Sequence, residues 1–296
     1  MGKKMLFVYN PKAGKAQIKN KLADILDVFA AGGYEITICP TQKRGDATER
    51  VANRDTSYDL VVCSGGDGTL DEAVTGMMRS EWRTPIGYIP AGSTNDFGGS
   101  LSLPKNMLRA ARVIVNGTNY ACDIGAFNGD YFVYIAAFGL FTDVSYETAQ
   151  DVKNVLGHMA YLLEGMKRLS AIRSYPMKVT YDDKVIEDDF IFGMVTNSQS
   201  VGGFKRITGK NVKLDDGVFE VTLIKRPKNP MELNNIMVSL LNRDIDSDAM
   251  YCFRTGRVMF ESTEEVAWTR DGEYGGGHTQ VTIVNQCKAV DIRVDG

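Results

Sequence analysis

Short apolar runs alternate with amphipathic segments in the first part of the chain. Apolar residues recur at helical spacing at residues 18–29 and again at 73–78, and Gly32-Gly33 ends the first of these patterns. The apolar runs before and between them have the length of buried strands and are residues 4–9, 34–39, 60–64 and 86–89. Alternating strands and helices predict a parallel sheet covered on both faces, which binds ligands at the carboxyl ends of its strands.

From about Ala121 the pattern changes to strands joined by tight turns, such as a hairpin turn at Asn128-Gly129. One helical stretch, residues 152–169, interrupts this pattern. The expected strands are residues 177–181, 185–196, 219–224, 250–260, 265–268 and 279–284. A chain of 296 residues is near the size at which a second core forms. We therefore expect an α/β domain over residues 1–122 and a mainly β domain over 123–296, with the final residues packing back on the first domain.

Composition narrows the classes of function. The chain is 44% apolar and 24% charged, which is typical of a soluble globular protein, and its net charge of −3 argues against nucleic acid as a partner. The longest nearly apolar run, residues 131–140, has roughly half the length of a membrane-spanning helix, so we expect no transmembrane segment. Five dispersed cysteines suit reduced thiols and predict a cytoplasmic location.

The stretch Gly65-Gly66-Asp67-Gly68-Thr69 follows one of the apolar runs and precedes a helical pattern. Glycines let phosphate oxygens approach main-chain N–H groups, and the positive end of a helix favours the same anion. Thr69 and Glu72 have the spacing of a capping box at the start of this helix. The stretch predicts a phosphate site with a carboxylate beside it. A glycine-rich turn that binds nothing is the alternative.

Two further loops end predicted strands in the same way. Residues 10–14, Asn-Pro-Lys-Ala-Gly, form a phosphate-type loop without the spacing of a Walker A motif, and residues 90–97 combine small and polar side chains. Within the second loop, Asp96 would also suit a helix cap. Because all three loops fall at the carboxyl ends of parallel strands, we expect them to form one site.

These motifs carry a resemblance to a known family. Residues 65–69 resemble the nucleotide-binding signature of diacylglycerol kinase catalytic domains, sphingosine and ceramide kinases, NAD kinases and phosphofructokinases. Residues 90–97 resemble a block of the diacylglycerol kinase-like lipid kinases that the last two groups lack. With residues 10–14 and 271–273, four motifs follow in family order over nearly the whole chain. The resemblance implies an α/β nucleotide-binding domain like that of NAD kinase and phosphofructokinase, followed by a β-sandwich domain.

The resemblance also implies ATP and Mg²⁺ as cofactors. Asp67, Asp96 and Asp123 would organise the catalytic Mg²⁺ directly or through water, and Asp67 would take part in catalysis. The residues that would bind the nucleotide are Asn10, Pro11, Lys12, Ala13, Gly14, Thr41, Gly65, Gly66, Asp67, Gly68, Thr69, Leu70, Glu72, Gly92, Ser93, Thr94 and Asn95.

Two further sites follow from the resemblance, although the residues alone predict ordinary turns at both. Asp271 would be the general base and Glu273 would support the base or the nucleotide, in a stretch expected to be mobile. The side chain of Asp216 and the carbonyls of Lys213 and Val218 would bind a structural Mg²⁺.

The expected function is transfer of the γ-phosphoryl group of ATP to a lipid hydroxyl group. The first candidate for the acceptor is diacylglycerol, which would give phosphatidic acid for phospholipid synthesis. The lipid would be met by peripheral contact with a membrane, and relatives suggest a homodimer. Two alternatives stay open: a soluble-substrate kinase of the NAD kinase type, and a nucleotide-binding lipid sensor without turnover. One departure from the family pattern is Asp71, where many members have Asn.

Overall fold

The computed structural model describes residues 2–140, 172–201, 204–205, 212–242 and 248–296. The chain divides into two compact units, which are Met1–Ile124 with Cys287–Gly296 (unit 1) and Gly125–Gln286 (unit 2). The helix expected at residues 152–169 lies outside the described residues. Over the described ranges, no helix has both the length and the apolar character needed to cross a membrane.

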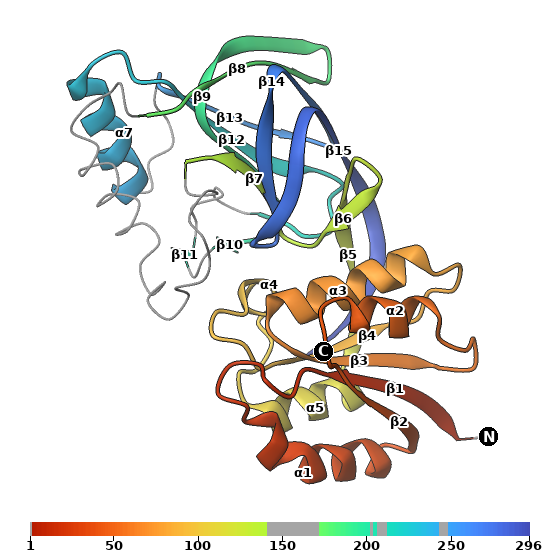
Figure 1. The fold of residues 1–296 in the computed structure, drawn as a ribbon. Helices are drawn as coiled ribbons and strands as arrows, with labels where there is room; N and C mark the ends of the chain where they lie inside the picture. The colour runs from red at the N-terminus through yellow and green to blue at the C-terminus, as the bar shows by residue number, and fades with distance from the viewer. Residues whose placement is uncertain (1, 141–171, 202–203, 206–211, 243–247) are drawn as a thin grey trace. The chain divides into compact units, whose positions relative to one another are not determined.

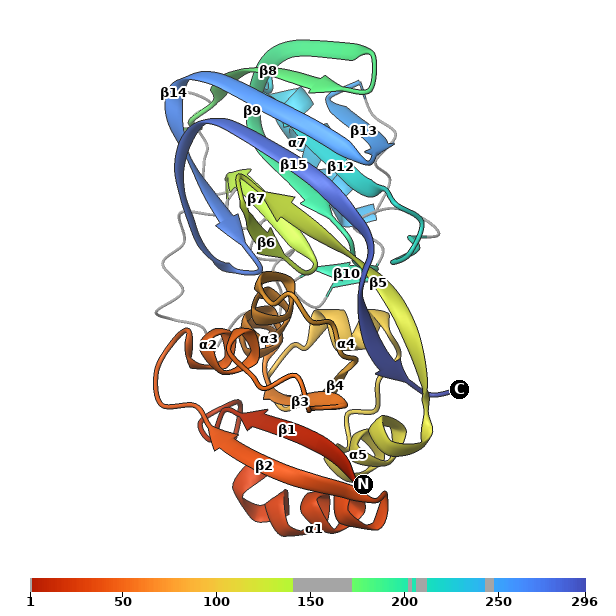
Figure 2. The same ribbon diagram turned by 90° about the vertical axis from the view of Figure 1, so that its right-hand side faces the viewer.

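Unit 1 alternates strands and helices along the chain. Its strands pair in parallel in the order β4-β3-β1-β2, with α1 and α5 on one face and α2 and α3 on the other (Figures 1 and 2). The last strand of the chain, β15 (Glu273–Val294), adds to the β4 edge through the pair Ile292 and Ile86. The other elements are β1 (Lys3–Tyr9), α1 (Ile18–Ala31), β2 (Tyr34–Pro40), α2 (Asp46–Ala52), β3 (Leu60–Gly65), α3 (Asp67–Arg79), β4 (Ile86–Pro90), α4 (Asp96–Ser100) and α5 (Met107–Asn116).

The core packing and the strand register of unit 1 bring the carboxyl ends of its strands together. Ile18, Ile25 and Phe29 lie on one face of α1 at helical spacing and pack with the buried side chains of β1 and β3. The register pairs Tyr9 with Ser64 and Gly65 with Pro90. The carboxyl ends of β1, β3 and β4 therefore lie next to one another, and the loops that follow them start from one edge of the sheet.

Unit 2 is mainly antiparallel. The long strands β9 and β14 each pair with β8 along one half and with β7 along the other. Its core includes Trp268, whose ring centroid lies 4.8 Å from that of Phe138 and 5.1 Å from that of Phe260. The elements are β5 (Thr118–Phe127, entering from unit 1), β6 (Asp130–Phe132), β7 (Ile135–Gly139), β8 (Tyr175–Tyr181), β9 (Lys184–Thr196), β10 (Ser200–Val201), β11 (Phe204–Lys205), β12 (Phe219–Lys225), α7 (Pro230–Asn242), β13 (Met250–Thr255), β14 (Arg257–Arg270) and the first part of β15.

Several local expectations for unit 2 need correction. The strands expected at 265–268 and 279–284 belong to one long hairpin, β14 and β15, so the stretch expected to be mobile is paired backbone. The helix α7, which the pattern did not predict, buries Leu233 and Ile236 in a second apolar cluster. The hairpin turn at Asn128-Gly129 is confirmed, because both residues have positive φ and join β5 to β6.

Candidate active site

The glycine-rich loop joins β3 to α3 in unit 1. β3 is buried along its whole length, and α3 begins at Asp67 with Gly66 as its N-cap. Gly66 has no side chain with which to cap this helix end. The first N–H groups of a helix have no partner within the helix, and a phosphate oxygen is a suitable acceptor for them. The loop thus has the local structure of an anion site.

The capping box expected for Thr69 and Glu72 is not formed. Glu72 instead accepts hydrogen bonds from the N–H groups of Gly45 (2.8 Å) and Ala47 (3.1 Å), at the start of α2. The helices α2 and α3 pack against each other, which brings these donors within reach of the Glu72 side chain. This carboxylate, which we expected to contact the nucleotide, therefore holds α2 against α3.

The three loops expected to bind the nucleotide approach one another closely at their glycines. A Cβ atom on Gly92 would lie 2.6 Å from the Cα atom of Gly66, which is closer than real Cβ atoms come to any heavy atom. Gly14 has a φ of +53°, and a Cβ there would lie 2.3 Å from the carbonyl oxygen of Ala91. Only glycine allows these backbone approaches. The structure thus joins the loops into one surface of main-chain atoms.

Polar groups hold the first loop in shape. The N–H group of Asn10 donates to the Ser64 carbonyl oxygen (2.8 Å), and the side-chain oxygen of Asn10 accepts from the N–H group of Lys12 (2.9 Å). The N–H group of Thr41 donates to the Tyr9 carbonyl oxygen (2.9 Å) at the end of β1. Thr41, which follows β2, is therefore held beside the carboxyl end of β1, where the loop of Asn10 begins.

The second loop is held by Asn95, which has a left-handed backbone (φ +53°). Its side-chain oxygen accepts from the N–H group of Gly92 (2.9 Å), and its side-chain nitrogen donates to the Gly92 carbonyl oxygen (2.8 Å). The hydroxyl group of Tyr88 lies 3.1 Å from this Asn95 oxygen and 3.1 Å from the carbonyl oxygen of Gly65. Tyr88 was not among the expected site residues, because an aromatic ring within an apolar run has the pattern of a core residue.

The three carboxylates expected around the catalytic Mg²⁺ all belong to unit 1. Asp67 lies in the first turn of α3, Asp96 is buried in the first turn of α4, and a carboxylate oxygen of Asp123 accepts from the N–H group of Lys288 (2.8 Å). Among the described residues, no three His, Cys, Asp or Glu side chains form a group that could hold a metal by themselves. A Mg²⁺ ion here would therefore depend on one or two of these carboxylates, with water and phosphate oxygens completing its shell, as is usual for this ion.

Asp271 lies in the turn between β14 and β15 in unit 2. Its buried carboxylate accepts hydrogen bonds from three successive N–H groups, those of Val133 (2.6 Å), Tyr134 (3.0 Å) and Ile135 (3.0 Å). Its own N–H group donates to the Ile135 carbonyl oxygen (2.8 Å). Three N–H donors stabilise an ionised carboxylate. The side chain expected to be a general base therefore also fixes the chain before β7, while Glu273 begins β15 on the other side of the turn.

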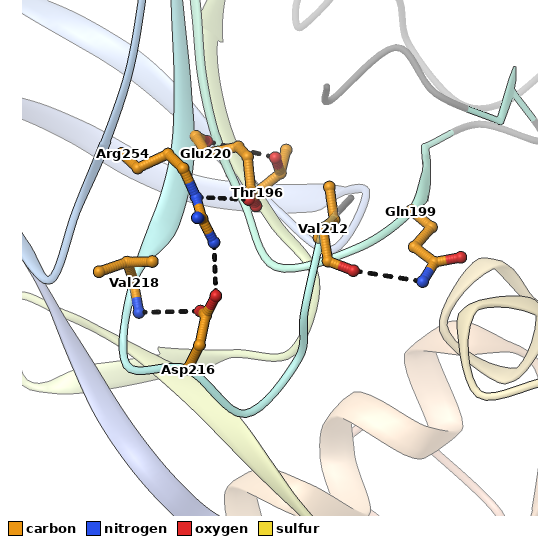
Figure 3. Close-up of polar contacts among 7 residues, drawn as sticks. All are labelled: Thr196, Gln199, Val212, Asp216, Val218, Glu220 and Arg254. Atoms are coloured by element: carbon orange, nitrogen blue, oxygen red, sulfur yellow. Dashed lines mark hydrogen bonds and ion pairs between the residues drawn. The ribbon is translucent and has the colours of Figure 1, made fainter. Parts of the chain in front are cut away.

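The turn expected to bind a structural Mg²⁺ holds an arginine. A terminal nitrogen of Arg254 lies 2.5 Å from a carboxylate oxygen of Asp216, and its Nε lies 3.1 Å from Oε1 of Glu220 (Figure 3). The other Asp216 oxygen accepts a long bond (3.4 Å) from the N–H group of Val218, and Lys213 is exposed. The guanidinium group of Arg254 therefore partly neutralises Asp216 in this structure, and the Mg²⁺ site at this turn stays a prediction.

Burial governs the protonation of two side chains near these sites. Burial, followed by the negative charge of Asp67, raises the pKa of Tyr88 well above its ordinary value, so its phenol is a neutral donor. Burial also raises the pKa of Glu220 to about 7, against the opposing attraction of Arg254. Glu220 thus changes its charge close to neutral pH, beside the ion pair of Arg254 and Asp216.

Comparison with known proteins finds matches over both units. Residues 4–127 match the family described as "Diacylglycerol kinase catalytic domain", and residues 137–293 match "YegS C-terminal NAD kinase beta sandwich-like domain". The chain is 34% identical to a diacylglycerol kinase of Bacillus subtilis (strain 168) over 278 residues, covering 93% of this chain and 91% of the relative. It is 35% identical to a diacylglycerol kinase of Staphylococcus carnosus (strain TM300) over 280 residues, covering 93% and 90%. The crystal structure of a diacylglycerol kinase from Bacillus anthracis str. Sterne superimposes with a TM-score of 0.78 at 26% identity, covering 99% of this chain and 97% of that one.

Proposed function

The chain belongs to the family of the diacylglycerol kinase catalytic domain and is a lipid kinase, and from this premise we propose that it transfers the γ-phosphoryl group of ATP to the hydroxyl group of diacylglycerol. The product is phosphatidic acid, an intermediate of phospholipid synthesis. The observation that carries the proposal is the close approach of Gly66 and Gly92, which joins two loops at the edge of the parallel strands.

ATP binds in this proposal to the carboxyl ends of β1, β3 and β4. Backbone N–H groups near Gly66 and Gly68, at the start of α3, bind phosphate oxygens, and glycine at these positions leaves them accessible. Asn10 and Asn95 keep their loops in shape through their own backbone contacts. Their side chains therefore support ATP binding indirectly, by fixing the backbone of the two loops.

Asp67, with support from Asp96 and Asp123, would hold Mg²⁺ beside the phosphates in this proposal. When bound, the ion neutralises charge on the transferring phosphoryl group. Asp67 lies one residue after the N-cap of α3, where the N–H groups of the helix start are also found. The carboxylate, through Mg²⁺, and the amides, through hydrogen bonds, could therefore both neutralise charge on neighbouring phosphate oxygens.

Asp271 is the proposed acceptor of the proton from the lipid hydroxyl, and Glu273 supports this step. Its carboxylate accepts three N–H hydrogen bonds, an arrangement suited to a carboxylate anion, which is the form in which a base acts. A positioned base contributes roughly 10²–10⁴-fold to the rate of a proton transfer. The lipid is met at a membrane surface, and we extend to this chain the expectation of a homodimer.

A transfer assay tests the proposal. Labelled ATP and Mg²⁺ are incubated with micelles of diacylglycerol, undecaprenol or a sphingoid base, and separately with NAD. The unaltered chain is compared with Asp67→Asn and with Asp24→Asn, a matched change at an exposed position of α1. We expect labelled phosphatidic acid from the unaltered chain and from Asp24→Asn, and a loss of at least about 100-fold in Asp67→Asn.

Each other outcome of the assay has a defined meaning. Labelling of NAD without labelling of any lipid would replace the proposal by a kinase of the NAD kinase type. Binding of ATP without transfer to any acceptor would support a lipid sensor. Labelling of another lipid alcohol in place of diacylglycerol would keep the reaction and change its acceptor.

A further inference from the structure

Tyr88 lies in the buried strand β4, and its side chain is almost inaccessible to solvent. Most of the ring fills space in the core, but the hydroxyl group is a polar group that must find a partner when buried. Its single proton is shared between two acceptors, the carbonyl oxygen of Gly65 and the side-chain oxygen of Asn95, both at 3.1 Å. Gly65 ends β3, whereas Asn95 follows β4, so one phenol contacts both loops.

The contact with Gly65 fixes the direction of a peptide group. The Gly65 carbonyl oxygen accepts from the N–H group of Ala91 (2.8 Å) as well as from Tyr88, which occupies both of its lone pairs. The peptide bond is planar and trans, so the N–H group of Gly66 points opposite to this carbonyl group. Holding the Gly65 oxygen toward β4 therefore turns the Gly66 N–H group away from β4.

The contact with Asn95 reaches the second loop. The Asn95 side chain cannot exchange its oxygen and nitrogen, because the oxygen accepts from the N–H group of Gly92 and the nitrogen donates to the Gly92 carbonyl oxygen. Tyr88 thus binds the side chain that closes the loop at Gly92, directly beside the contact of Gly92 with Gly66. The hydroxyl group of Tyr88 therefore links the two loops in addition to the bond from the Ala91 N–H group and the pairing of Gly65 with Pro90.

We propose that Tyr88 is a positioning residue for the polyphosphate of the nucleotide, because its hydroxyl group helps to fix both the direction of the Gly66 N–H group and the distance between the loops at Gly66 and Gly92. This inference rests on the proposed function and deepens it. Tyr88 itself touches no substrate. A chain with Phe at this position keeps the ring but has no donor for Gly65 and Asn95.

The test compares Tyr88→Phe with Tyr58→Phe. Tyr58 is a matched control in the same unit, since its phenol also donates a hydrogen bond, to Thr37 at 2.9 Å. The dissociation constants of ATP and of adenosine are measured by calorimetry on the full chain with Mg²⁺, and KM for ATP, KM for diacylglycerol and kcat are measured by the transfer assay. For Tyr88→Phe we expect about a tenfold weaker affinity for ATP and a KM for ATP raised by about the same factor, which corresponds to the loss of one buried hydrogen bond.

Adenosine separates positioning from a general structural effect. It lacks phosphate, so its affinity should stay within about twofold in Tyr88→Phe, as should KM for diacylglycerol. The Tyr58→Phe chain should match the unaltered chain in every measurement. An unchanged affinity for ATP in Tyr88→Phe, or an equal loss for ATP and adenosine, would overturn the inference and leave the proposed function standing. An unaltered chain that binds no ATP would overturn both.

Discussion

Asp271→Asn changes one oxygen of a buried carboxylate to an NH₂ group. The unaltered carboxylate accepts from Val133 at 2.6 Å on one oxygen, and from Tyr134 and Ile135 at 3.0 Å on the other. In the variant, the oxygen can keep its two donors, but the NH₂ group then faces the N–H group of Val133. A buried donor without an acceptor costs about 2 kcal/mol, and each remaining bond loses about 1 kcal/mol with the negative charge.

We therefore expect Asp271→Asn to lower the free energy of unfolding of unit 2 by about 4 kcal/mol. With an m-value of about 2 kcal/mol/M, the urea midpoint of unit 2 falls by about 2 M. The assay is urea unfolding followed by fluorescence of Trp268, which is buried in the core of unit 2. Trp82, which is 61% exposed in unit 1, is changed to Phe in all chains so that it does not contribute.

Asp130→Asn is the matched control, because Asp130 in the same unit pairs with Arg270 at a partly exposed position. A pair of that kind contributes at most about 1 kcal/mol, so its midpoint should fall by less than about 0.5 M. If Asp271→Asn unfolds at the midpoint of the unaltered chain, the three hydrogen bonds do not stabilise unit 2 and the reasoning is refuted. Loss of activity in Asp271→Asn identifies a base only when kcat is measured without urea on protein shown to be folded.

Three further predictions concern the other sites. Glu220→Gln should remove a pH dependence: burial raises the pKa of Glu220 from 4.5 to about 7, so the folded chain favours the protonated form and its free energy of unfolding falls as pH rises from about 4.5 to 7. The urea midpoints of the unaltered chain and of Glu220→Gln, measured across this pH range, test this prediction. An equal dependence of the midpoint on pH in the two chains would contradict it. If Asp216 holds the expected structural Mg²⁺, EDTA should lower the urea midpoint of unit 2 in the nucleotide-free chain by more than about 0.5 M; an unchanged midpoint would show that the ion pair of Asp216 with Arg254 stabilises this turn without a metal. Gly92→Ala should weaken ATP binding at least tenfold by calorimetry, because its Cβ would lie 2.6 Å from Gly66. The control Gly99→Ala, whose Cβ would have no atom within 4 Å, should bind ATP as the unaltered chain does, and equal affinities in the two variants would contradict the close approach.

The three loops could be predicted from the sequence because their signals are local. A buried run followed by glycine and a helical pattern identifies each strand end without knowledge of the rest of the fold. The contact of Gly66 with Gly92 could not be predicted from such local signals, although both glycines lie in the predicted loops. Their approach depends on the register of β3 and β4, which a periodic pattern does not encode.

The residues whose roles differ from expectation all have distant partners. Glu72 has the local spacing of a capping box, but its donors lie in a different helix. Arg254 and Tyr88 carried no signal, since an arginine in a strand usually lies in solvent and a tyrosine in an apolar run usually fills the core. Identifying their partners requires the pairing of β13 with β12 and the path of the loop after β4.

The strand β15 makes the folding of unit 1 depend on residues that are synthesised after unit 2. Val290 and Ile292 are buried in unit 1, and Lys288 binds Asp123, yet all of unit 2 precedes them in the chain. During translation, the edge of β4 therefore stays open until these residues leave the ribosome. An open strand edge attracts other extended chains. We expect the nascent protein to depend on protection of this edge while unit 2 is being made, and ATP binding to arise only after Val290 and Ile292 have been made.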